Sequence, residues 1–314
     1  MIHKKPLVSI ITAMFNGQDT LDDCYRSVIS QTYKDFEWLV VDDQSTDHSF
    51  EMISNLPDSR IRLLQTSANT GGPAAPRNLA VDNSKGEFIA ILDQDDIWDP
   101  DKLERQLDFM EKNRDIGFLS CNMRVIDDCA QRVTRAAIRK PGLRYPDADD
   151  IYRENPFLSS AIILRRFIIE DIGGFDECPE VCGRDEWELA IRVSLKYRTA
   201  FNGDHIAGSY RSHQNNLSLA ILPSFGIGYL RNKHDHRFPD SLVRDVRGRD
   251  CYNIARGAFS SGEMDVFEEQ ISRAASYRSF YKWKGIFLKY KKYCKALAFM
   301  EPTSVKLPRH RIFF

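Results

Sequence analysis

The sequence predicts an α/β protein with a parallel sheet in its first part and a helical region at its end. Two observations lead to this prediction. Short β-branched runs alternate with segments of helical periodicity in the first half, and strand-like runs stop near residue 218. The 314 residues, 42% of them hydrophobic, are enough for about two domains. We expect one domain over residues 1–217, with halves of about 1–123 and 124–217, and a helical region over 218–314.

The first half carries four predicted strands, each followed by a predicted helix. The strands are expected at residues 7–12, 36–41, 61–64 and 88–92. The helices are expected at residues 21–29, 49–55, 75–83 and 100–110, where apolar residues recur every three or four positions. Asp99 before Pro100 is a typical N-cap and first-turn pair, and Asp47 is a candidate cap for the second helix. This alternation favours parallel β-α-β units.

The pattern is less regular beyond residue 123. A further strand is expected at residues 159–164, and a helix at 186–196 after the turn at Gly173-Gly174. Near the end of the chain, aromatic and other apolar residues from Phe280 to Leu297 recur at helical spacing and are flanked by lysines. Such a helix could lie on an anionic membrane surface, or it could pack against the first domain with its lysines in solvent.

Charge and cysteine content narrow the class of protein. The 44 Lys+Arg residues nearly balance the 45 Asp+Glu residues, so no positive excess predicts binding to nucleic acid. No apolar run approaches the roughly 18 residues of a transmembrane helix, and no signal-peptide core follows Met1, so we expect a cytoplasmic protein. Seven scattered cysteines favour reduced thiols. Cys178 and Cys182 form the only close pair, which we interpret as loop thiols because no second pair completes a zinc site.

Acidic residues follow two of the predicted strands. These runs are Asp42-Asp43 and Asp93-Gln94-Asp95-Asp96. Because ligands of open parallel sheets bind beyond the carboxyl ends of the strands, these carboxylates should lie at one binding edge. Dense negative charge there favours a bound cation, and an Asp-x-Asp pair suits Mg²⁺ or Mn²⁺ shared with a phosphate.

The sequence contains no glycine-rich loop for phosphate. The first strand leads into Thr12-Ala13-Met14-Phe15-Asn16 without a G-x-G-x-x-G motif, and there is no Walker A lysine loop. A metal ion and an arginine would therefore have to hold a phosphate. Arg77, at the start of the third predicted helix, could pair with a diphosphate. A solvated surface arginine is an equally good interpretation from this position alone.

Several ordered motifs resemble those of family 2 glycosyltransferases. They are PLVSIITAMFN at 6–16, SQTYKDFE at 30–37, VVDDQSTD at 40–47, PRN at 76–78, LDQDD at 92–96 and GGFDE at 173–177. The resemblance covers about residues 6–215. It implies the GT-A fold, a Rossmann-like nucleotide-sugar-binding domain, in an inverting transferase of bacterial surface-polysaccharide type. It also implies a nucleotide-diphosphate sugar as donor, with UDP as the expected carrier, and a glycan or lipid-linked glycan as acceptor.

On the donor side, the resemblance implies a nucleoside pocket and a divalent metal, Mn²⁺ or Mg²⁺. The nucleotide-binding set would be Thr12, Ala13, Phe15, Asn16, Asp43, Arg77, Asp93 and Gln94. Asp43 would accept a hydrogen bond from the base, and Asp93 would lie near the ribose or the sugar. Asp95 would bind the metal, which neutralises the departing diphosphate. His213 would be a further metal ligand or a diphosphate contact, although a lone histidine is often structural.

On the acceptor side, inversion in one displacement needs a carboxylate base on the face opposite the leaving group. The family has an acidic pair before an aromatic residue, and this sequence has Asp185-Glu186-Trp187. Glu186 falls where the resemblance implies the base, and Asp185 stays an alternative. Both could instead be ordinary acids at a helix N-terminus. Trp187 and Asp96 would contact the acceptor or the sugar, whereas Trp98 is expected in the core.

Two other functions are compatible with these residues. A nucleotidyltransferase would use a related α/β fold and a carboxylate-bound metal, but it would release pyrophosphate. A glycan-binding or scaffold protein of the same fold would bind its ligand without turnover. The intact Asp93-Gln94-Asp95 motif favours an enzyme.

Overall fold

The computed structural model describes residues 7–128, 132–213 and 223–278, together with residues 281, 284, 285 and 288. The chain divides into two compact units, Met1–His234 and Asp235–Phe314. The first unit continues past the expected boundary at residue 217, because helix α9 (Pro223–His234) packs on the short 3₁₀ turn η2 (Pro179–Val181). The site-bearing unit therefore includes one helix more than the sequence pattern predicted.

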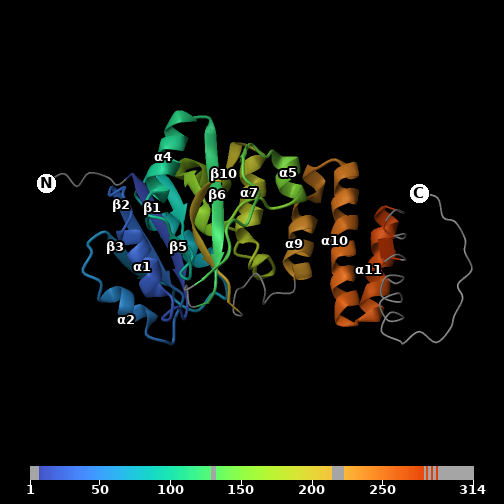
Figure 1. Ribbon diagram of the computed structural model, residues 1–314, viewed down its shortest axis with the longest axis horizontal. Helices are drawn as coiled ribbons and strands as arrows, with labels where there is room; N and C mark the ends of the chain where they lie inside the picture. Colours follow the sequence, from blue (N-terminus) through green and yellow to red (C-terminus); the bar gives the residue numbers. More distant parts are fainter. Residues whose placement is uncertain are drawn as a thin grey trace, which may run out of the picture. The chain divides into compact units, whose positions relative to one another are not determined.

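Over the residues described, the strands of the first unit form one ten-stranded mixed sheet (Figure 1). Its first half contains β1 (Val8–Met14), β2 (Phe36–Asp42), β3 (Ile61–Gln65) and β4 (Phe88–Ile91). These four strands are parallel and lie in the order β3-β2-β1-β4. The prediction of parallel β-α-β units is confirmed for this half. Strands β1, β2 and β4 are almost entirely buried, which is why their sequences are mostly apolar, whereas β3 at the edge of the sheet is only half-buried.

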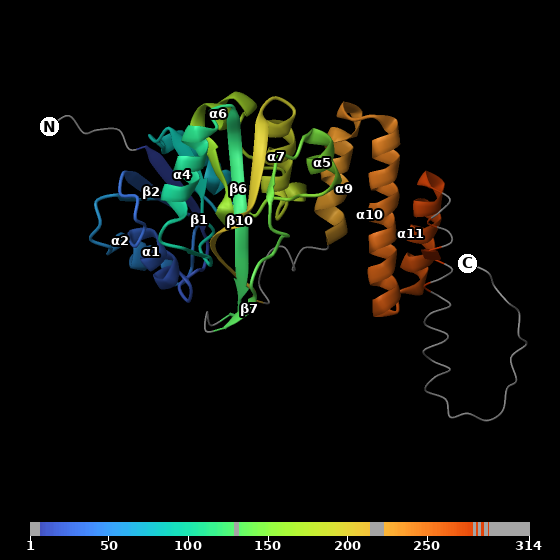
Figure 2. The ribbon, with the colours of Figure 1, turned by 45° about the horizontal axis from the view of Figure 1, so that its top comes forward.

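The second half extends the same sheet with strands of both directions. They are β5 (Ile97–Trp98), β6 (Ile116–Ile126), β7 (Val133–Arg135), β8 (Leu143–Arg144), β9 (Ile163–Arg165) and β10 (Arg198–Arg211). Strand β9 runs antiparallel to both β4 and β6, and β10 runs parallel to β6, beside which it lies in Figure 2. The strand expected at 159–164 starts later, because residues Ser159–Ala161 form the 3₁₀ turn η1.

Helices pack on both parts of this sheet. They are α1 (Leu21–Ile29), α2 (Ser49–Ser54), α3 (Ala74–Asn83), α4 (Lys102–Lys112), α5 (Ala148–Arg153), α6 (Arg166–Ile172) and α7 (Asp185–Ser194). Leu21 of α1 and Leu103 of α4 belong to one buried cluster with the strands. Helix α3, whose first turns contain the PRN motif, packs on β1 and β2.

Two capping predictions have different outcomes. Asp99 is not the cap of α4, since that helix begins at Lys102 and its N-cap is Asp101. The carboxylate of Asp99 instead accepts two hydrogen bonds of 2.7 Å from the Arg124 guanidinium, so an ion pair replaced the cap. Asp47 does satisfy the start of α2, because Asp47 Oδ1 accepts a hydrogen bond of 2.9 Å from the amide of Ser49.

The second unit is helical over the residues described. It contains the 3₁₀ turn η3 (Asp235–Arg237), α10 (Asp240–Ser261) and α11 (Met264–Tyr277). The two helices pack together, with Ala255 and Phe267 fully buried. The predicted basic helix from Phe280 to Leu297 lies largely outside the described residues. Within the described part of the chain, no helix has the length and apolar character needed to cross a membrane.

Candidate functional site

The loops after β1 and β4 are joined at the carboxyl edge of the parallel strands. The amide of Phe15 donates to Gln94 Oε1 at 2.9 Å, and Gln94 Nε2 donates to the carbonyl of Phe15 at 2.9 Å. A Cβ atom at Gly17 would lie only 2.5 Å from Gln94 Oε1, so glycine permits this close approach. The structure therefore uses Gln94, which the sequence placed in the nucleotide-binding set, to hold the backbone of the neighbouring loop.

Two non-glycine residues with positive φ lie in the loops after β1 and β2. They are Asn16, with φ of 49°, and Gln44, with φ of 65°. Asn16 Oδ1 accepts a hydrogen bond of 2.8 Å from the amide of Thr46, which joins the two loops. Such conformations cost free energy and are found where surrounding contacts fix them, often at binding sites. Next to Asn16, the ring of Phe15 is 45% exposed on the same edge.

Asp43 and Thr12 lie in the wall behind these loops. The carboxylate of Asp43 is buried and accepts hydrogen bonds from Thr66 Oγ1 at 2.8 Å and from the Thr70 amide at 3.0 Å. The hydroxyl of Thr12 is also buried, and it accepts a hydrogen bond of 2.9 Å from Trp38 Nε1. The Thr12 side chain is therefore directed into the core. Phe15 and Asn16 are the exposed members of the predicted nucleoside set, and Ala13 is half-buried.

Arg77 connects the two halves of the first unit. Its Nη2 atom lies 2.5 Å from Asp93 Oδ1, at the end of β4, and its Nη1 atom donates to Asp185 Oδ2, at the start of α7. Nη2 also donates to Ser159 Oγ at 3.1 Å. Burial alone would lower the pKa of Arg77, but the charges of Asp185 and Asp93 outweigh it and raise the pKa. Arg77 is thus no solvated surface side chain: it is 3% exposed.

Asp185 and Glu186 occupy the first turn of α7, where the helix dipole favours negative charge. Burial raises the pKa of Glu186 to about 7, and the neighbouring charge of Asp185 contributes to the rise. Burial also raises the pKa of Asp185, although the ion pair with Arg77 opposes this shift. Within the described part of the chain, Asp185 is the member of the pair whose carboxylate is held by an ion pair. Glu186 is only half-buried and its charge changes near neutral pH.

The structure brings together the two residues predicted to bind a metal. His213 Nε2 lies 2.8 Å from Asp95 Oδ2, and both side chains are partly exposed. The hydrogen bond to Asp95 raises the pKa of His213. Among the residues that the structure describes, no group of three or more Asp, Glu, His or Cys is arranged to hold a metal ion. The protein therefore offers two candidate ligands here.

Asp96 and Trp187, which were predicted to contact the acceptor or the sugar, are buried side chains. Asp96 is 1% exposed, and its carboxylate accepts hydrogen bonds from Ser160 Oγ at 2.5 Å and from the Arg211 amide at 2.9 Å. Trp187 is buried, and its Nε1 atom donates to the carbonyl of Ile151 at 2.7 Å. Both side chains are thus bonded within the protein in this structure, and their contact with sugar or acceptor stays a prediction. The prediction that Trp98 is a core residue is confirmed.

The comparisons with known proteins agree with this geometry. The family model for Glycosyl transferase family 2 matches residues 9–173. The chain is 30% identical over 222 residues to the putative teichuronic acid biosynthesis glycosyltransferase TuaG of Bacillus subtilis (strain 168), a match that covers 69% of this chain and 84% of TuaG.

The chain belongs to glycosyltransferase family 2.

Other relatives of this family 2 chain extend the comparison. It is 43% identical over 122 residues to WfgD of Escherichia coli, named a UDP-Glc:α-D-GlcNAc-diphosphoundecaprenol β-1,3-glucosyltransferase; 39% of this chain and 47% of WfgD are covered. The structure of S. aureus TarS 1–349 in complex with UDP-GlcNAc matches with a TM-score of 0.67 and 19% identity, over 86% of this chain and 81% of TarS 1–349. The mannosyltransferase PcManGT of Pyrobaculum calidifontis, in complex with GDP-Man and Mn²⁺, matches with a TM-score of 0.61, 16% identity and coverage of 94% and 84%. The fold is GT-A.

The family 2 motifs have two kinds of structural position in this chain. Some of their residues lie on the edge of the sheet or in the charged network that crosses it, and these are Phe15, Asn16, Arg77, Asp93, Asp95, Asp185 and Glu186. Others hold loops together, as Gln94 and Asp96 do. A motif match by itself does not distinguish residues that could contact a ligand from residues that hold loops together.

Sequence reasoning missed the importance of Arg211. This arginine is 2% exposed, and its Nε atom donates to the carbonyl of Asp95 at 2.9 Å while Nη2 donates to Asp23 Oδ2 at 2.7 Å. It thereby fixes the backbone of the Asp-Gln-Asp segment from β10. The available signal was its place two residues before His213. The signal was weak because Asp23 and Asp95 are remote in sequence.

Proposed function

We propose that this family 2 enzyme transfers a sugar from a nucleoside diphosphate donor, with UDP as the carrier, to a hydroxyl of a glycan or lipid-linked glycan, with inversion. The observation that carries the proposal is the network around Arg77. This buried guanidinium bonds Asp93 of the donor half and Asp185 of the acceptor half, and Glu186, with a pKa raised to about 7, follows directly. The arrangement puts Asp93, the proposed sugar-binding carboxylate, at one end of the charged bridge and Asp185 at the other, next to Glu186, the proposed proton acceptor.

The donor side offers an exposed aromatic ring and two metal ligands. The ring of Phe15 is available to stack on a nucleobase. Asp95 and His213 would hold Mn²⁺ or Mg²⁺, since a carboxylate oxygen and an imidazole nitrogen suit Mn²⁺, and two protein ligands leave positions for water and phosphate oxygens. When bound, such an ion neutralises the charge that develops on the leaving diphosphate.

On the acceptor side, we assign the base role to Glu186. A general base works best when its pKa lies near the operating pH, because it must be ionised and still accept a proton readily. Burial gives Glu186 this property. Asp185, the alternative, is bonded to Arg77, so its role is to hold that guanidinium and to help raise the pKa of Glu186.

The substrates are proposed from the names of relatives. WfgD and WfaP of Escherichia coli are both named for transfer from UDP-Glc to α-D-GlcNAc-diphosphoundecaprenol, and TuaG is named for teichuronic acid biosynthesis. We infer that this enzyme acts in bacterial surface polysaccharide assembly. A lipid-linked acceptor would bring it to the inner surface of the membrane as a peripheral protein.

The proposal is tested with the purified protein, a panel of nucleotide sugars and Mn²⁺. UDP-glucose, UDP-galactose, UDP-GlcNAc and GDP-mannose are incubated with and without a synthetic GlcNAc-diphospho-lipid, and release of UDP or GDP is measured. We expect one UDP-sugar to be hydrolysed slowly alone and consumed faster with acceptor, and chelation by EDTA to stop both reactions. Release of pyrophosphate from a sugar phosphate and a nucleoside triphosphate, without UDP release, would contradict the proposal.

A further inference from the structure

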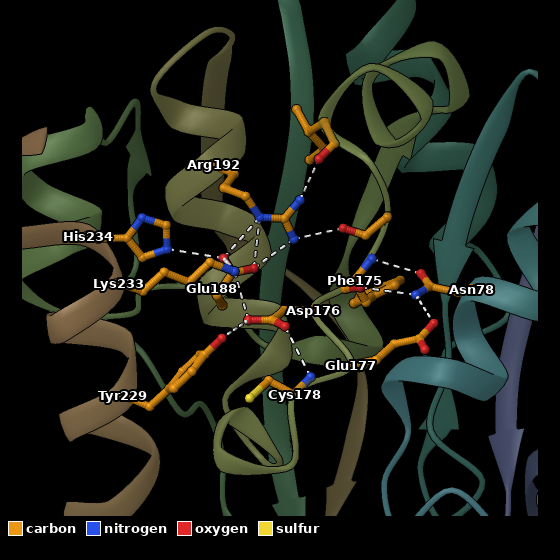
Figure 3. Close-up of polar contacts among 12 residues, drawn as sticks. Asn78, Phe175, Asp176, Glu177, Cys178, Glu188, Arg192, Tyr229, Lys233 and His234 are labelled. Carbon is orange, nitrogen blue, oxygen red and sulfur yellow. Dashed lines mark hydrogen bonds and ion pairs between the residues drawn. The ribbon is translucent and has the colours of Figure 1, made fainter.

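Side chains from two neighbouring helices hold the loop over residues 173–178 through hydrogen bonds (Figure 3). From α3, Asn78 Oδ1 accepts a hydrogen bond of 2.7 Å from the Phe175 amide, and Asn78 Nδ2 donates to the Phe175 carbonyl at 3.0 Å. From α7, Arg192 donates to the carbonyls of Ile172 and Gly174, both at 2.7 Å. Gly174 has φ of 74°, and a Cβ atom there would lie 2.6 Å from Asn78 Oδ1. Glycine at position 174 therefore permits the close contact between the loop and Asn78.

A third helix, α9, reaches the same loop through Lys233. The Lys233 ammonium lies 2.7 Å from Asp176 Oδ2 in the loop and 2.7 Å from Glu188 Oε1 on α7. Figure 3 shows this side chain extending from α9 to the two carboxylates. Tyr229, one turn earlier on α9, donates to Asp176 Oδ2 at 2.9 Å. Lys233 is thus the cation shared by the loop and α7.

Glu188 is the buried carboxylate at the centre of the cluster formed with Lys233, Arg192 and His234. Its side chain is fully buried, and it accepts hydrogen bonds from Arg192 at 2.6 Å and 2.8 Å and has His234 Nε2 at 3.0 Å. Burial alone would raise the pKa of Glu188, but the hydrogen bonds from His234 and Arg192 overcome it and lower the pKa to about 2. Because an ionised carboxylate in the interior must keep its partners, the cluster fixes α7 against α9 and the loop.

Residues that hold the loop and α7 in place are close in sequence to Arg77 and Asp185, which form the buried ion pair. Asn78, which grips the loop, follows Arg77 directly on α3. Glu188, which binds Lys233, lies one helical turn after Asp185 on α7. Any displacement of α7 relative to the loop would therefore also move Asp185 and Glu186, which form the first turn of α7.

We propose that Lys233 is a positioning residue of the transfer reaction: by joining Asp176 to Glu188, it holds the start of α7 beside Arg77. This inference rests on the proposed function. Lys233 makes no contact with the β1, β2 or β4 loops among the interactions described for it, so it should affect the chemical step and leave binding of the nucleotide unchanged. A small misplacement of reacting groups can reduce a rate many-fold.

The test compares K233M, which keeps the length of the side chain and removes its charge, with the wild type. We expect kcat for release of UDP from the preferred UDP-sugar to fall about tenfold. The Kd for UDP with Mn²⁺ and the donor KM should stay within about twofold of the wild type, because the donor loops keep their contacts. K233R, which retains a cation able to reach both carboxylates, should recover most of the lost kcat.

The matched control is K196M. Lys196 belongs to the same unit and pairs with Asp171, but its side chain is 57% exposed, so the same loss of charge should leave kcat unchanged. A wild-type kcat in K233M, or a parallel loss of UDP binding and kcat, would overturn the positioning role.

If K233M fails to fold, D176N carries the test. This change keeps the shape of the loop and should lower kcat about threefold without affecting UDP binding; an unchanged kcat would again overturn the inference. A wild-type protein that neither binds UDP nor releases it from any nucleotide sugar contradicts the proposed function instead. The two failures are therefore distinguishable.

Discussion

The parallel strands of the donor half and helix α7 of the acceptor half differ in the contacts that hold them in place. In the donor half, β1, β2 and β4 pack through fully buried apolar side chains such as Ile10 and Val40. In the acceptor half, α7 buries apolar side chains such as Leu189, and it also carries buried charges. Its Asp185 is bonded to Arg77, and its Glu188 is bonded to Arg192 and Lys233. Apolar packing tolerates changes that conserve volume. Buried ion pairs do not tolerate the loss of one partner, since the other is left uncompensated. The contacts that are most sensitive to substitution therefore lie at the start of α7, where the proposed proton transfer occurs.

The largest effect is expected at the proposed base. Glu186→Gln keeps the size of the side chain but removes its ability to accept a proton, so kcat for transfer should fall by about a thousandfold. The Kd for UDP with Mn²⁺, measured by calorimetry, should stay unchanged because Glu186 lies outside the donor loops. Transfer at the wild-type rate would move the base to Asp185 or end the mechanism.

Removal of the bridging arginine tests whether charge holds the acceptor half. Arg77→Met leaves two carboxylates without their partner, and Asp185 is buried. We expect the free energy of unfolding to drop by about 3–5 kcal/mol, which chemical denaturation would measure. Arg26→Met is the control, because Arg26 pairs with Asp22 while 72% exposed; it should cost at most about 1 kcal/mol. Equal effects of the two changes would contradict the distinction between the halves.

The pH dependence of the rate tests the environment of Glu186. The base must be ionised, and burial raises the pKa of Glu186 to about 7. At saturating donor and acceptor, kcat should therefore increase with pH through this value, by about tenfold from pH 6 to pH 8. A rate that is constant over this range would show that an ordinary, already ionised carboxylate acts as the base.

The smallest effect is expected in the donor half. Ile10→Val in β1 removes one buried methylene group and should lower the free energy of unfolding by about 0.5–1.5 kcal/mol. Neither UDP binding nor kcat should change, because the strand backbone and its register with β2 are kept. Loss of UDP binding in this variant would mean that the donor half is as sensitive to small displacements as the acceptor half.

The difference between the halves also explains which parts of the fold could be predicted. The strands β1 to β4 are short apolar runs between clear helical segments, so local pattern was sufficient. Strand β6 was not predicted, because Ser120 and Asn122 interrupt its apolar run and are buried only through partners elsewhere in the chain. Asp99 was misassigned for the same reason, since its partner Arg124 is remote in sequence.

The sequence by itself determined that the first half consists of parallel β-α-β units, and it identified the family. Both conclusions depend on short runs of residues. It also identified the acids that follow β2 and β4. Only the tertiary structure decided which of these acids are exposed and which are buried, as Asp96 and Asp43 are. It likewise decided that Arg77 binds Asp93 and Asp185, and that Lys233 joins Asp176 to Glu188. The physical reason is that burial and ion pairing depend on groups brought together from distant positions, and no local pattern encodes that proximity.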